Sequence, residues 1–200
     1  GQAGRVAIIA GSRGMSGAAV LTGLGTLRGG AGLVRVYTAA SVQPVVAGAE
    51  PCLMSRALAE DAEGRIAFDR ADAKRLELDW PTVIGIGPGL GRSDDLANLV
   101  WHVLGAFPGP VVVDADGLNN LASRPPGQWS TRAGRPTVIT PHPGEMARLR
   151  QGAGLPPLAG DEDEIRVRLA HEYACLAQCV VVLKGHRTVV ARPGGKSYVN

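Results

Sequence analysis

The amino-acid sequence predicts an α/β domain built on a mostly parallel β-sheet that helices cover on both faces. Short runs of β-branched residues alternate with longer helical stretches, which is the order that parallel strands with helical crossovers require. The 200 residues suffice for one such domain with a large buried core. Polar, Gly-rich motifs follow several apolar runs directly, and ligands of open α/β sheets bind at such strand ends.

The predicted strands are short apolar runs rich in Val and Ile. None approaches the ~20 residues that a membrane-spanning helix needs, and the first is too short for the core of a signal peptide. We therefore expect a protein without a membrane partner. The strands are predicted at residues 5–10, 33–38, 82–86, 110–113, 136–139, 179–183 and 188–191.

The predicted helices cover residues 17–28, 94–105 and 161–178, with a shorter one after TPHPGE. The segment 161–178 opens with four alternating Asp and Glu residues, which suit the positive end of a helix dipole. Residues 41–79 are less clear and predict one or two helices and a short strand. We find no internal repeat and no domain boundary.

Composition and charge exclude several classes of function. The net charge of +3 comes from scattered basic residues, and aromatic residues make up 4% of the chain, so a nucleic-acid partner is not expected. Cys52, Cys175 and Cys179 are too few and wrongly spaced for a zinc site or a disulfide framework. We expect reduced, buried thiols in a cytoplasmic protein.

Five polar motifs follow predicted strands, and their clustering at one sheet edge predicts a ligand site. The familiar phosphate motifs do not account for them. A Walker A loop ending at Gly195-Lys196-Ser197 would need Gly where Val190 stands, and the glycines of GIGPGLG do not form G-x-G-x-x-G. The motifs are GSRG (11–14), GPGLG (87–91), DADG (114–117), TPHPGE (140–145) and KGHRT (184–188).

The two motifs in the middle of the chain each have a structural and a functional interpretation. GPGLG is either a turn into a helix capped by Arg92, Ser93 or Asp94, or a place where backbone approaches a ligand closely. One of Asp114 and Asp116 caps a helix, or the two carboxylates orient a metal-bound water or a cationic substrate group.

The later motifs also leave two interpretations open. His142 and Glu145 either cap a helix or belong to a site that two prolines and a glycine stiffen. Lys184 closes a very apolar strand, so it either extends to solvent or meets an anion. Gly185 would let the backbone turn against a nucleotide, whereas His186 alone is a weak signal.

Taken together, in order and spacing, these motifs resemble the ADP-dependent NAD(P)H-hydrate dehydratases. The resemblance runs from Gly4 to Asn200 and is weakest between residues 41 and 79. Five ordered motifs make it specific, although any one alone would not. The segments that carry it are AGSRGMSGAAVLTGLGTLRGGAGLV, GIGPGLG, VVDADGLNNLA, VITPHPGEMARL and VVLKGHRTVVA.

The resemblance implies a single ribokinase-like dehydratase domain over residues 1–200 and the repair of hydrated nicotinamide cofactors. The enzymes of this family restore NADH or NADPH from the S-form of the hydrates NADHX and NADPHX, converting ADP to AMP and phosphate. Magnesium, a cytoplasmic location and a homotetramer are expected on the same ground. Two rival functions stay open, a kinase of vitamin-precursor alcohols with the same fold and a non-catalytic nucleotide-binding homologue.

Site roles follow from the same resemblance. Ala18, Gly89 and His142 are expected to line the hydrate pocket, and Glu145 to lie near the waters of magnesium, with Asp114 and Asp116 as further candidates. The adenine nucleotide is expected at Lys184, Gly185, His186, Arg187 and Thr188.

One departure from the family concerns the catalytic base. The family has a GTGD-like loop whose amides hold the phosphate and whose Asp is the expected base, and no such loop occurs before Asn200. We therefore expect a domain that is incomplete at its C-terminus, with the catalytic Asp beyond Asn200. On that expectation the 200-residue chain by itself lacks dehydratase activity.

Overall fold

The computed structural model describes residues 3–125, 132, 134–158, 160 and 162–200. Within them, one nine-stranded sheet has the order β3-β2-β1-β4-β5-β6-β7-β8-β9. The pairings from β3 to β7 are parallel, while β8 and β9 are antiparallel additions at one edge. The predicted mostly parallel α/β fold is confirmed.

Most predicted elements occur within one or two residues of the expected bounds. The strands are β1 Arg5–Ile9, β2 Leu33–Ala39, β3 Met54–Leu58, β4 Val83–Ile86, β5 Val111–Val113, β6 Thr137–Ile139, β7 Val180–Leu183, β8 Val189–Ala191 and β9 Tyr198–Val199. The helices are α1 Ser16–Arg28, α2 Gln43–Ala49, the 3-10 helix η1 Arg70–Leu76, α3 Asp94–Ala106, α4 Asp116–Leu121, α5 Pro143–Gly152 and α6 Asp163–Ala177.

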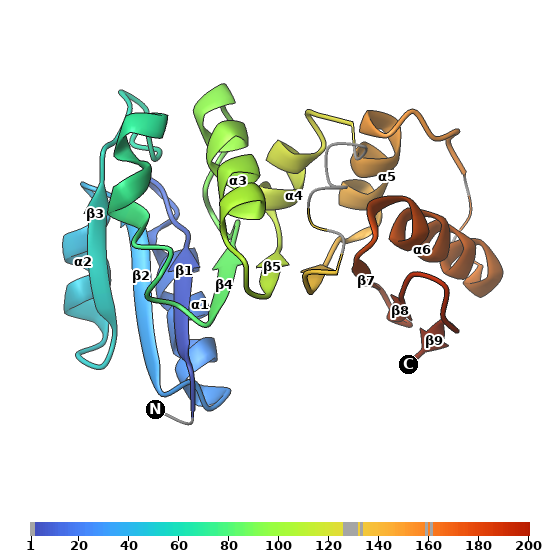
Figure 1. Ribbon diagram of the computed structural model, residues 1–200, viewed down its shortest axis with the longest axis horizontal. Helices are drawn as coiled ribbons and strands as arrows, with labels where there is room; N and C mark the ends of the chain where they lie inside the picture. Colours follow the sequence, from blue (N-terminus) through green and yellow to red (C-terminus); the bar gives the residue numbers. More distant parts are fainter. Residues whose placement is uncertain (1–2, 126–131, 133, 159, 161) are drawn as a thin grey trace.

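The chain changes direction across the sheet between β1 and β4. From β1 it moves to β2 and β3 on one side, and from β4 it moves to β5, β6 and β7 on the other. Since crossovers between parallel strands are right-handed, the helices of the two halves lie on opposite faces, as Figure 1 shows for α1 and α3. The neighbours β1 and β4 therefore form the switch point at which ligands of such sheets bind.

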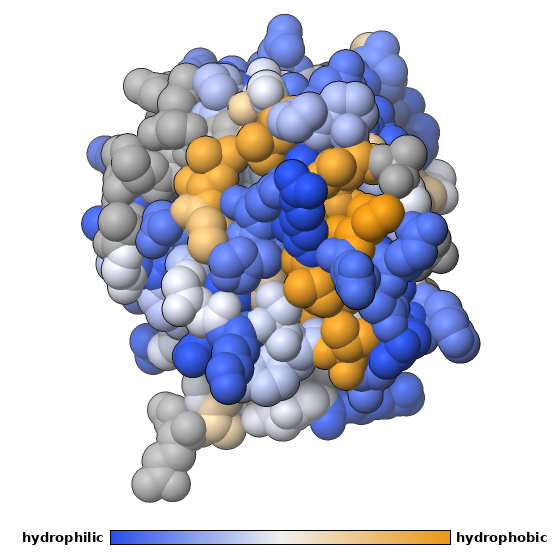
Figure 2. Space-filling view, turned by 90° about the vertical axis from the view of Figure 1, so that its right-hand side faces the viewer, coloured by the Kyte–Doolittle hydropathy of each residue, from blue (hydrophilic) through white to orange (hydrophobic). Residues whose placement is uncertain are grey.

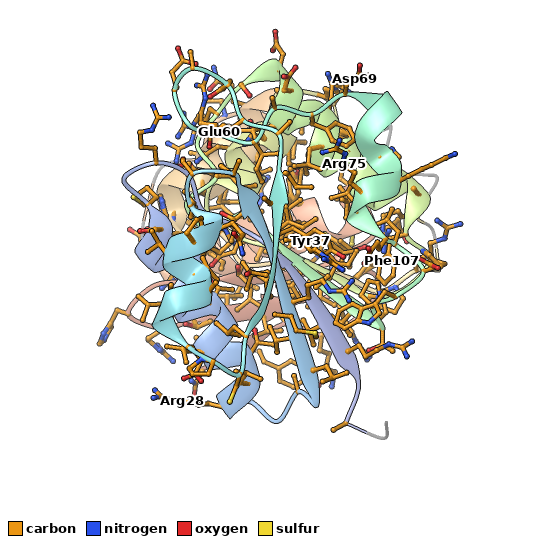
Figure 3. The ribbon with its side chains drawn as sticks, turned by 90° about the vertical axis from the view of Figure 1, so that its left-hand side faces the viewer. Arg28, Tyr37, Glu60, Asp69, Arg75 and Phe107 are labelled. Carbon is orange, nitrogen blue, oxygen red and sulfur yellow. The ribbon has the colours of Figure 1, made fainter. Side chains whose placement is uncertain are left out.

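The core fills the space between the sheet and its helices. Tyr37 on β2 is fully buried and lies near the middle of the view in Figure 3, and the buried Phe107, which is the C-cap of α3, lies to its right. Strand β1 contributes Ile8 and Ile9, and α3 buries six side chains against the sheet. This packing fixes the strands whose ends carry the polar motifs.

The cysteines correct one prediction. All three are free, but only Cys179 is buried, and burial raises the pKa of its thiol to about 12. Cys52 is exposed because it lies in the turn between α2 and β3, and Cys175 is half-buried on α6. Among the described helices, none combines the length and apolar character that crossing a membrane requires.

A substitution at Gly87 tests the close packing at the end of β4. It has φ +134°, and a Cβ there would overlap the carbonyl oxygen of Asp114. We expect Gly87→Ala to lower the free energy of unfolding by at least about 2 kcal/mol, because overpacking and a conformation reserved for glycine add together. Denaturant unfolding followed by circular dichroism measures this.

Gly105→Ala is the matched control, since a Cβ there meets nothing within 4 Å and the residue lies in α3. It should leave stability unchanged or raise it by up to about 1 kcal/mol. Equal destabilisation by both substitutions would contradict the account of Gly87.

Candidate active site at the carboxyl edge of the sheet

At the switch point, the GSRG loop after β1 and the GPGLG loop after β4 are joined by hydrogen bonds. The backbone N–H of Gly11 donates to the carbonyl of Pro88 at 2.9 Å, and the Ser12 hydroxyl donates to the carbonyl of Gly89 at 2.7 Å. A Cβ built on Gly89 would lie 2.8 Å from the Cβ of Ala18. The predicted residues Ala18 and Gly89 are therefore in direct proximity, and the glycine is what allows it.

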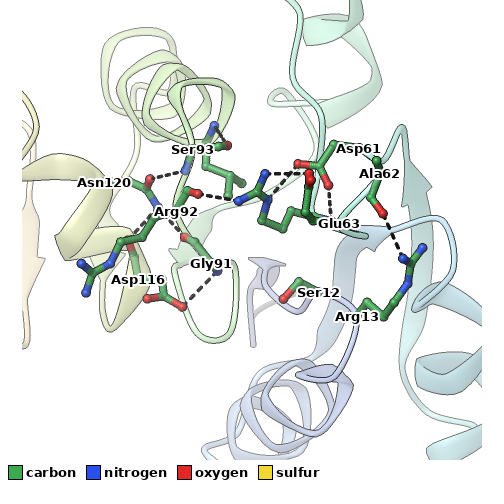
Figure 4. A network of polar contacts seen from close by, with 12 residues as sticks. Ser12, Arg13, Asp61, Ala62, Glu63, Gly91, Arg92, Ser93, Asp116 and Asn120 are labelled. Carbon is green, nitrogen blue, oxygen red and sulfur yellow. Dashed lines mark hydrogen bonds and ion pairs between the residues drawn. The ribbon is translucent and has the colours of Figure 1, made fainter.

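A third segment, residues 60–65, joins both loops, and sequence reasoning did not assign it to the site. The Arg13 guanidinium donates to the carbonyl of Ala62 at 3.0 Å, and Arg65 donates to the carbonyl of Arg92 at 2.8 Å and pairs with Asp61. Figure 4 shows these contacts on either side of Ser12. The signal available in the sequence was a dense charge cluster around Gly64, in the segment where the strand and helix pattern was weakest.

Asp116 fastens the GPGLG loop to α4. One carboxylate oxygen accepts the backbone N–H of Gly91 at 3.0 Å (Figure 4). The other accepts from the Asn119 amide at 3.1 Å. The N-cap of α4 is Ala115, without a side-chain cap, so neither Asp114 nor Asp116 is the cap that one interpretation allowed.

Ser93 is the residue that caps α3, its hydroxyl accepting the N–H of Leu96 at 3.1 Å. Of the three capping candidates that the sequence offered, the structure thus selects Ser93. The GPGLG loop is both a turn into a helix and a close approach of backbone segments.

Lys184 and Asp114 meet across the end of β6. The Lys184 ammonium donates to the Asp114 carboxylate at 2.7 Å, although the two residues come from the ends of β7 and β5. Partial burial acts to raise the pKa of Asp114, but hydrogen bonds from Lys184 and Thr140 and the Lys184 charge outweigh it, so this pKa lies below its ordinary value. The ammonium therefore stays at the site edge instead of extending freely into solvent.

His142 and Glu145 form a capping box at the start of α5. The His142 ring nitrogen Nδ1 accepts the N–H groups of Gly144 and Glu145, and the Glu145 carboxylate accepts the His142 N–H at 2.8 Å. Its other oxygen lies 3.3 Å from His142 Nε2. The structural interpretation of this pair is thus confirmed, while half of the His142 side chain remains exposed.

The KGHRT segment forms the turn between β7 and β8. The Lys184 N–H donates to the carbonyl of Pro141 at 2.8 Å, which anchors the turn beside His142. Gly185, His186 and Arg187 are exposed, and Arg187 pairs with Asp163 on α6. An exposed basic turn at the carboxyl end of a strand suits a phosphate-bearing ligand.

The predicted site residues thus form two clusters on the same edge. Ala18 and Gly89 lie at the switch point, whereas His142, Glu145 and residues 184–188 follow β6 and β7. Within the described ranges, no hydrogen bond joins the two clusters directly. A chain of hydrogen bonds connects them indirectly. Asn119 donates to Asp116 and accepts from Arg148 on α5 at 2.7 Å.

A mostly parallel α/β sheet with Gly-rich and basic loops at its carboxyl edge is the architecture of a ligand-binding α/β protein. The chain matches a ribokinase-like superfamily protein of Enterococcus faecalis with a TM-score of 0.74 at 24% identity, which supports the fold alone. The sequence model for NAD(P)H-hydrate dehydratase matches residues 6–200. The chain belongs to the NAD(P)H-hydrate dehydratase family.

Individual relatives agree with this assignment. The chain is 40% identical over 197 residues to the bifunctional NAD(P)H-hydrate repair enzyme Nnr of Moorella thermoacetica, covering 98% of this chain and 36% of that protein. It is 36% identical over 200 residues to the ADP-dependent (S)-NAD(P)H-hydrate dehydratase of Bacillus subtilis, covering 100% of this chain and 64% of that protein.

A solved structure extends the comparison. The crystal structure of the ADP/ATP-dependent NAD(P)H-hydrate dehydratase of Bacillus subtilis, co-crystallised with ATP and Mg²⁺ and soaked with CoA, superposes with a TM-score of 0.72 at 32% identity. The superposition covers 98% of this chain and 65% of that one. The chain thus spans just under two thirds of the single-function relatives and about a third of the bifunctional ones.

The Asp114–Lys184 pair predicts a specific dependence of stability on pH. Because the pKa of Asp114 is lowered in the folded state, its contribution is present above the ordinary carboxyl range and disappears as pH falls through the folded value. Asp114→Asn should therefore cost up to about 1 kcal/mol at neutral pH, since both side chains are over one third exposed and screened by solvent.

The difference in unfolding free energy between the parent protein and Asp114→Asn should shrink below about pH 4. Urea unfolding at a series of pH values measures it. A difference that stays constant down to pH 2 would show that the carboxylate charge is not what stabilises the pair.

Proposed function

We propose that the protein carrying this chain is an ADP-dependent NAD(P)H-hydrate dehydratase. The reaction restores NADH or NADPH from the S-form of its hydrate. ADP transfers a phosphoryl group to the hydroxyl of the hydrate, which releases AMP, and loss of phosphate then regenerates the dihydronicotinamide ring. Family membership over residues 6–200 carries this proposal. The two loop clusters on one sheet edge support it, because the reaction needs a hydrate and a nucleotide side by side.

The switch point is proposed as the hydrate pocket. Ala18 and Gly89 leave little side-chain bulk there, and His142 follows β6, two strands away from β4, with half its side chain exposed. Backbone held this tightly, by the Ser12 and Gly11 hydrogen bonds, gives a flat ring a rigid surface. Phosphoryl transfer is catalysed mainly by rigid positioning of the reactants and by neutralisation of the phosphate charge.

The turn from Lys184 to Thr188 is proposed to hold ADP. Lys184 is already fixed by Asp114, so binding a phosphate would require the ammonium to share its three donors between carboxylate and phosphate. Gly185, His186 and Arg187 contribute exposed backbone and side-chain donors. Asp114 is engaged by Lys184 and Asp116 by the Gly91 N–H, so neither carboxylate is proposed as the base that removes the hydroxyl proton.

Magnesium is proposed to accompany the nucleotide. Among the described residues, no three His, Cys, Asp or Glu side chains form a group that could hold a metal ion by themselves. Glu145 is 5% exposed and both its oxygens face His142, so magnesium-bound water would have to share them. These residues do not form a magnesium site of their own.

The family resemblance also underlies the proposals of a homotetramer and a cytoplasmic location. Gel filtration with light scattering of the natural protein tests the first. A tetramer would support it, and a monomer at all concentrations would contradict it.

Nucleotide preference is the first functional prediction. The natural protein carrying this sequence should bind ADP more tightly than NAD, since it has a basic turn at a strand end and no G-x-G-x-x-G loop. Lys184→Ala should weaken ADP binding about tenfold or more, because a charge-assisted hydrogen bond to phosphate is lost. Calorimetric titration with magnesium present measures both.

Lys196→Ala is a control for loss of one lysine charge elsewhere, as Lys196 lies beyond β8. Tight NAD binding without detectable ADP binding would contradict the nucleotide assignment. So would equal loss of ADP affinity in the two variants.

Two substitutions separate a catalytic role of His142 from its role as the N-cap of α5. His142→Ala should cost roughly 0.5–2 kcal/mol of stability through loss of the cap. His142→Ser keeps a capping oxygen but removes the imidazole, so it should retain more stability while turnover of NADPH hydrate falls as in His142→Ala. Unchanged turnover in His142→Ser would assign His142 a structural role only.

The activity assay itself separates the rival functions. Recovery of NADPH absorbance from its S-hydrate with ADP supports the dehydratase, whereas phosphorylation of thiazole or pyrimidine alcohols with ATP would favour a kinase. Nucleotide binding without either reaction in the natural full-length protein would favour a non-catalytic homologue.

A further inference from the structure

A cavity lies between α5, the segment that follows it and α6, and its lining includes Pro143, next to His142, and Leu183, next to Lys184. Its volume is about 780 Å³, within the range of small-molecule sites. Met146, Leu155, Leu169 and Leu183 supply apolar walls. Figure 2 faces the end of the molecule that carries α6 and shows apolar surface there between hydrophilic groups.

The charged groups of this cavity are arginines. Arg148, Arg150 and Arg166 line it, and no carboxylate does so among the described residues. Arg148 donates from Nε to the neutral amide of Asn119, and within the described ranges it forms no ion pair. Its positive charge is therefore not balanced by a carboxylate at the cavity.

Arg150 is the most informative of the three. It is 2% exposed and donates to the Glu172 carboxylate at 2.9 Å and to the carbonyl of Pro156 at 3.1 Å, but its Nε has no hydrogen-bond partner. Glu172 is shared, because Arg168 also pairs with it at 2.7 Å. Because Arg150 and Arg168 share the one carboxylate of Glu172, one positive charge is left without a counter-charge in this group. The unpaired, buried Nε–H of Arg150 also lowers stability unless an acceptor binds there.

The cavity also touches the back of the proposed nucleotide turn. Arg166 lies within 3.5 Å of the carbonyl oxygens of Leu183 and Lys184, and a Cβ on Gly185 would overlap its guanidinium. A molecule in the cavity would therefore sit one side chain away from the turn that we assign to ADP.

We propose that this cavity binds a small organic anion, an apolar body that carries one carboxylate or phosphate group. The apolar walls take the body, and Arg148 and Arg150 take the anionic group. The cavity adjoins the proposed hydrate and nucleotide residues but is lined by none of them, so this proposal does not require the proposed dehydratase activity.

The test uses the natural protein carrying this sequence and three probes in calorimetric titrations: 1-naphthyl phosphate, 1-naphthoate and the neutral 1-naphthol. Both anions should bind, with 1-naphthol about tenfold weaker or more. The two anionic probes also distinguish a preference for phosphate from one for carboxylate. Absence of binding by both anions, or equal binding of the neutral probe, would overturn the proposal.

Variants locate the probe. Arg150→Gln should weaken anion binding about tenfold or more, whereas Arg168→Gln, which contacts the same Glu172 from outside the cavity, should leave it within about twofold. Ala147→Trp, at an exposed lining position, should block the cavity even where Arg150→Gln fails to fold. Unchanged affinity in Ala147→Trp, or displacement by ADP with both cavity variants unaffected, would place the probe elsewhere and overturn the proposal.

Discussion

The candidate site depends on one constraint, the close contact of backbone with backbone at the end of β4. Gly87 lies against the carbonyl of Asp114, and Gly117 at the start of α4 lies against the carbonyl of Ile86, each so close that a Cβ would collide. These contacts draw the loop after β5 under the GPGLG loop. Asp116 can then bond Gly91, and Asp114 is held where Lys184 reaches it. Without the glycines, neither carboxylate would occupy its place.

This constraint also explains an unusual backbone conformation. Ala115, which lies between the two aspartates, has φ +50° and ψ −125°. Residues other than glycine rarely adopt this backbone conformation. Strain of this kind persists only where surrounding structure fixes it, and it is common at functional sites. Here the fixing contacts are the Gly91–Asp116 and Lys184–Asp114 hydrogen bonds on its two sides.

Much of this arrangement could be predicted from sequence. The Val- and Ile-rich runs predicted the parallel strands β4 to β7, and each of these runs is followed by a polar motif that has to lie at one edge of the sheet. Residues 60–65 could not be placed, because they contact the site through backbone carbonyls and long arginine side chains that have no periodic signal. The capping box of His142 and Glu145 was foreseen only as one alternative, since spacing alone does not separate a cap from a ligand-binding residue.

Chemical-shift mapping on the ¹⁵N-labelled natural protein tests the central claim most directly, since glycine amides give resolved signals at both loop clusters. With magnesium present, ADP should shift the amides of Gly185 to Thr188, and NADPH hydrate added afterwards should shift those of Gly87, Gly89 and Gly91. The account would be contradicted if both ligands left these amides unmoved and shifted residues at the opposite, amino end of the strands.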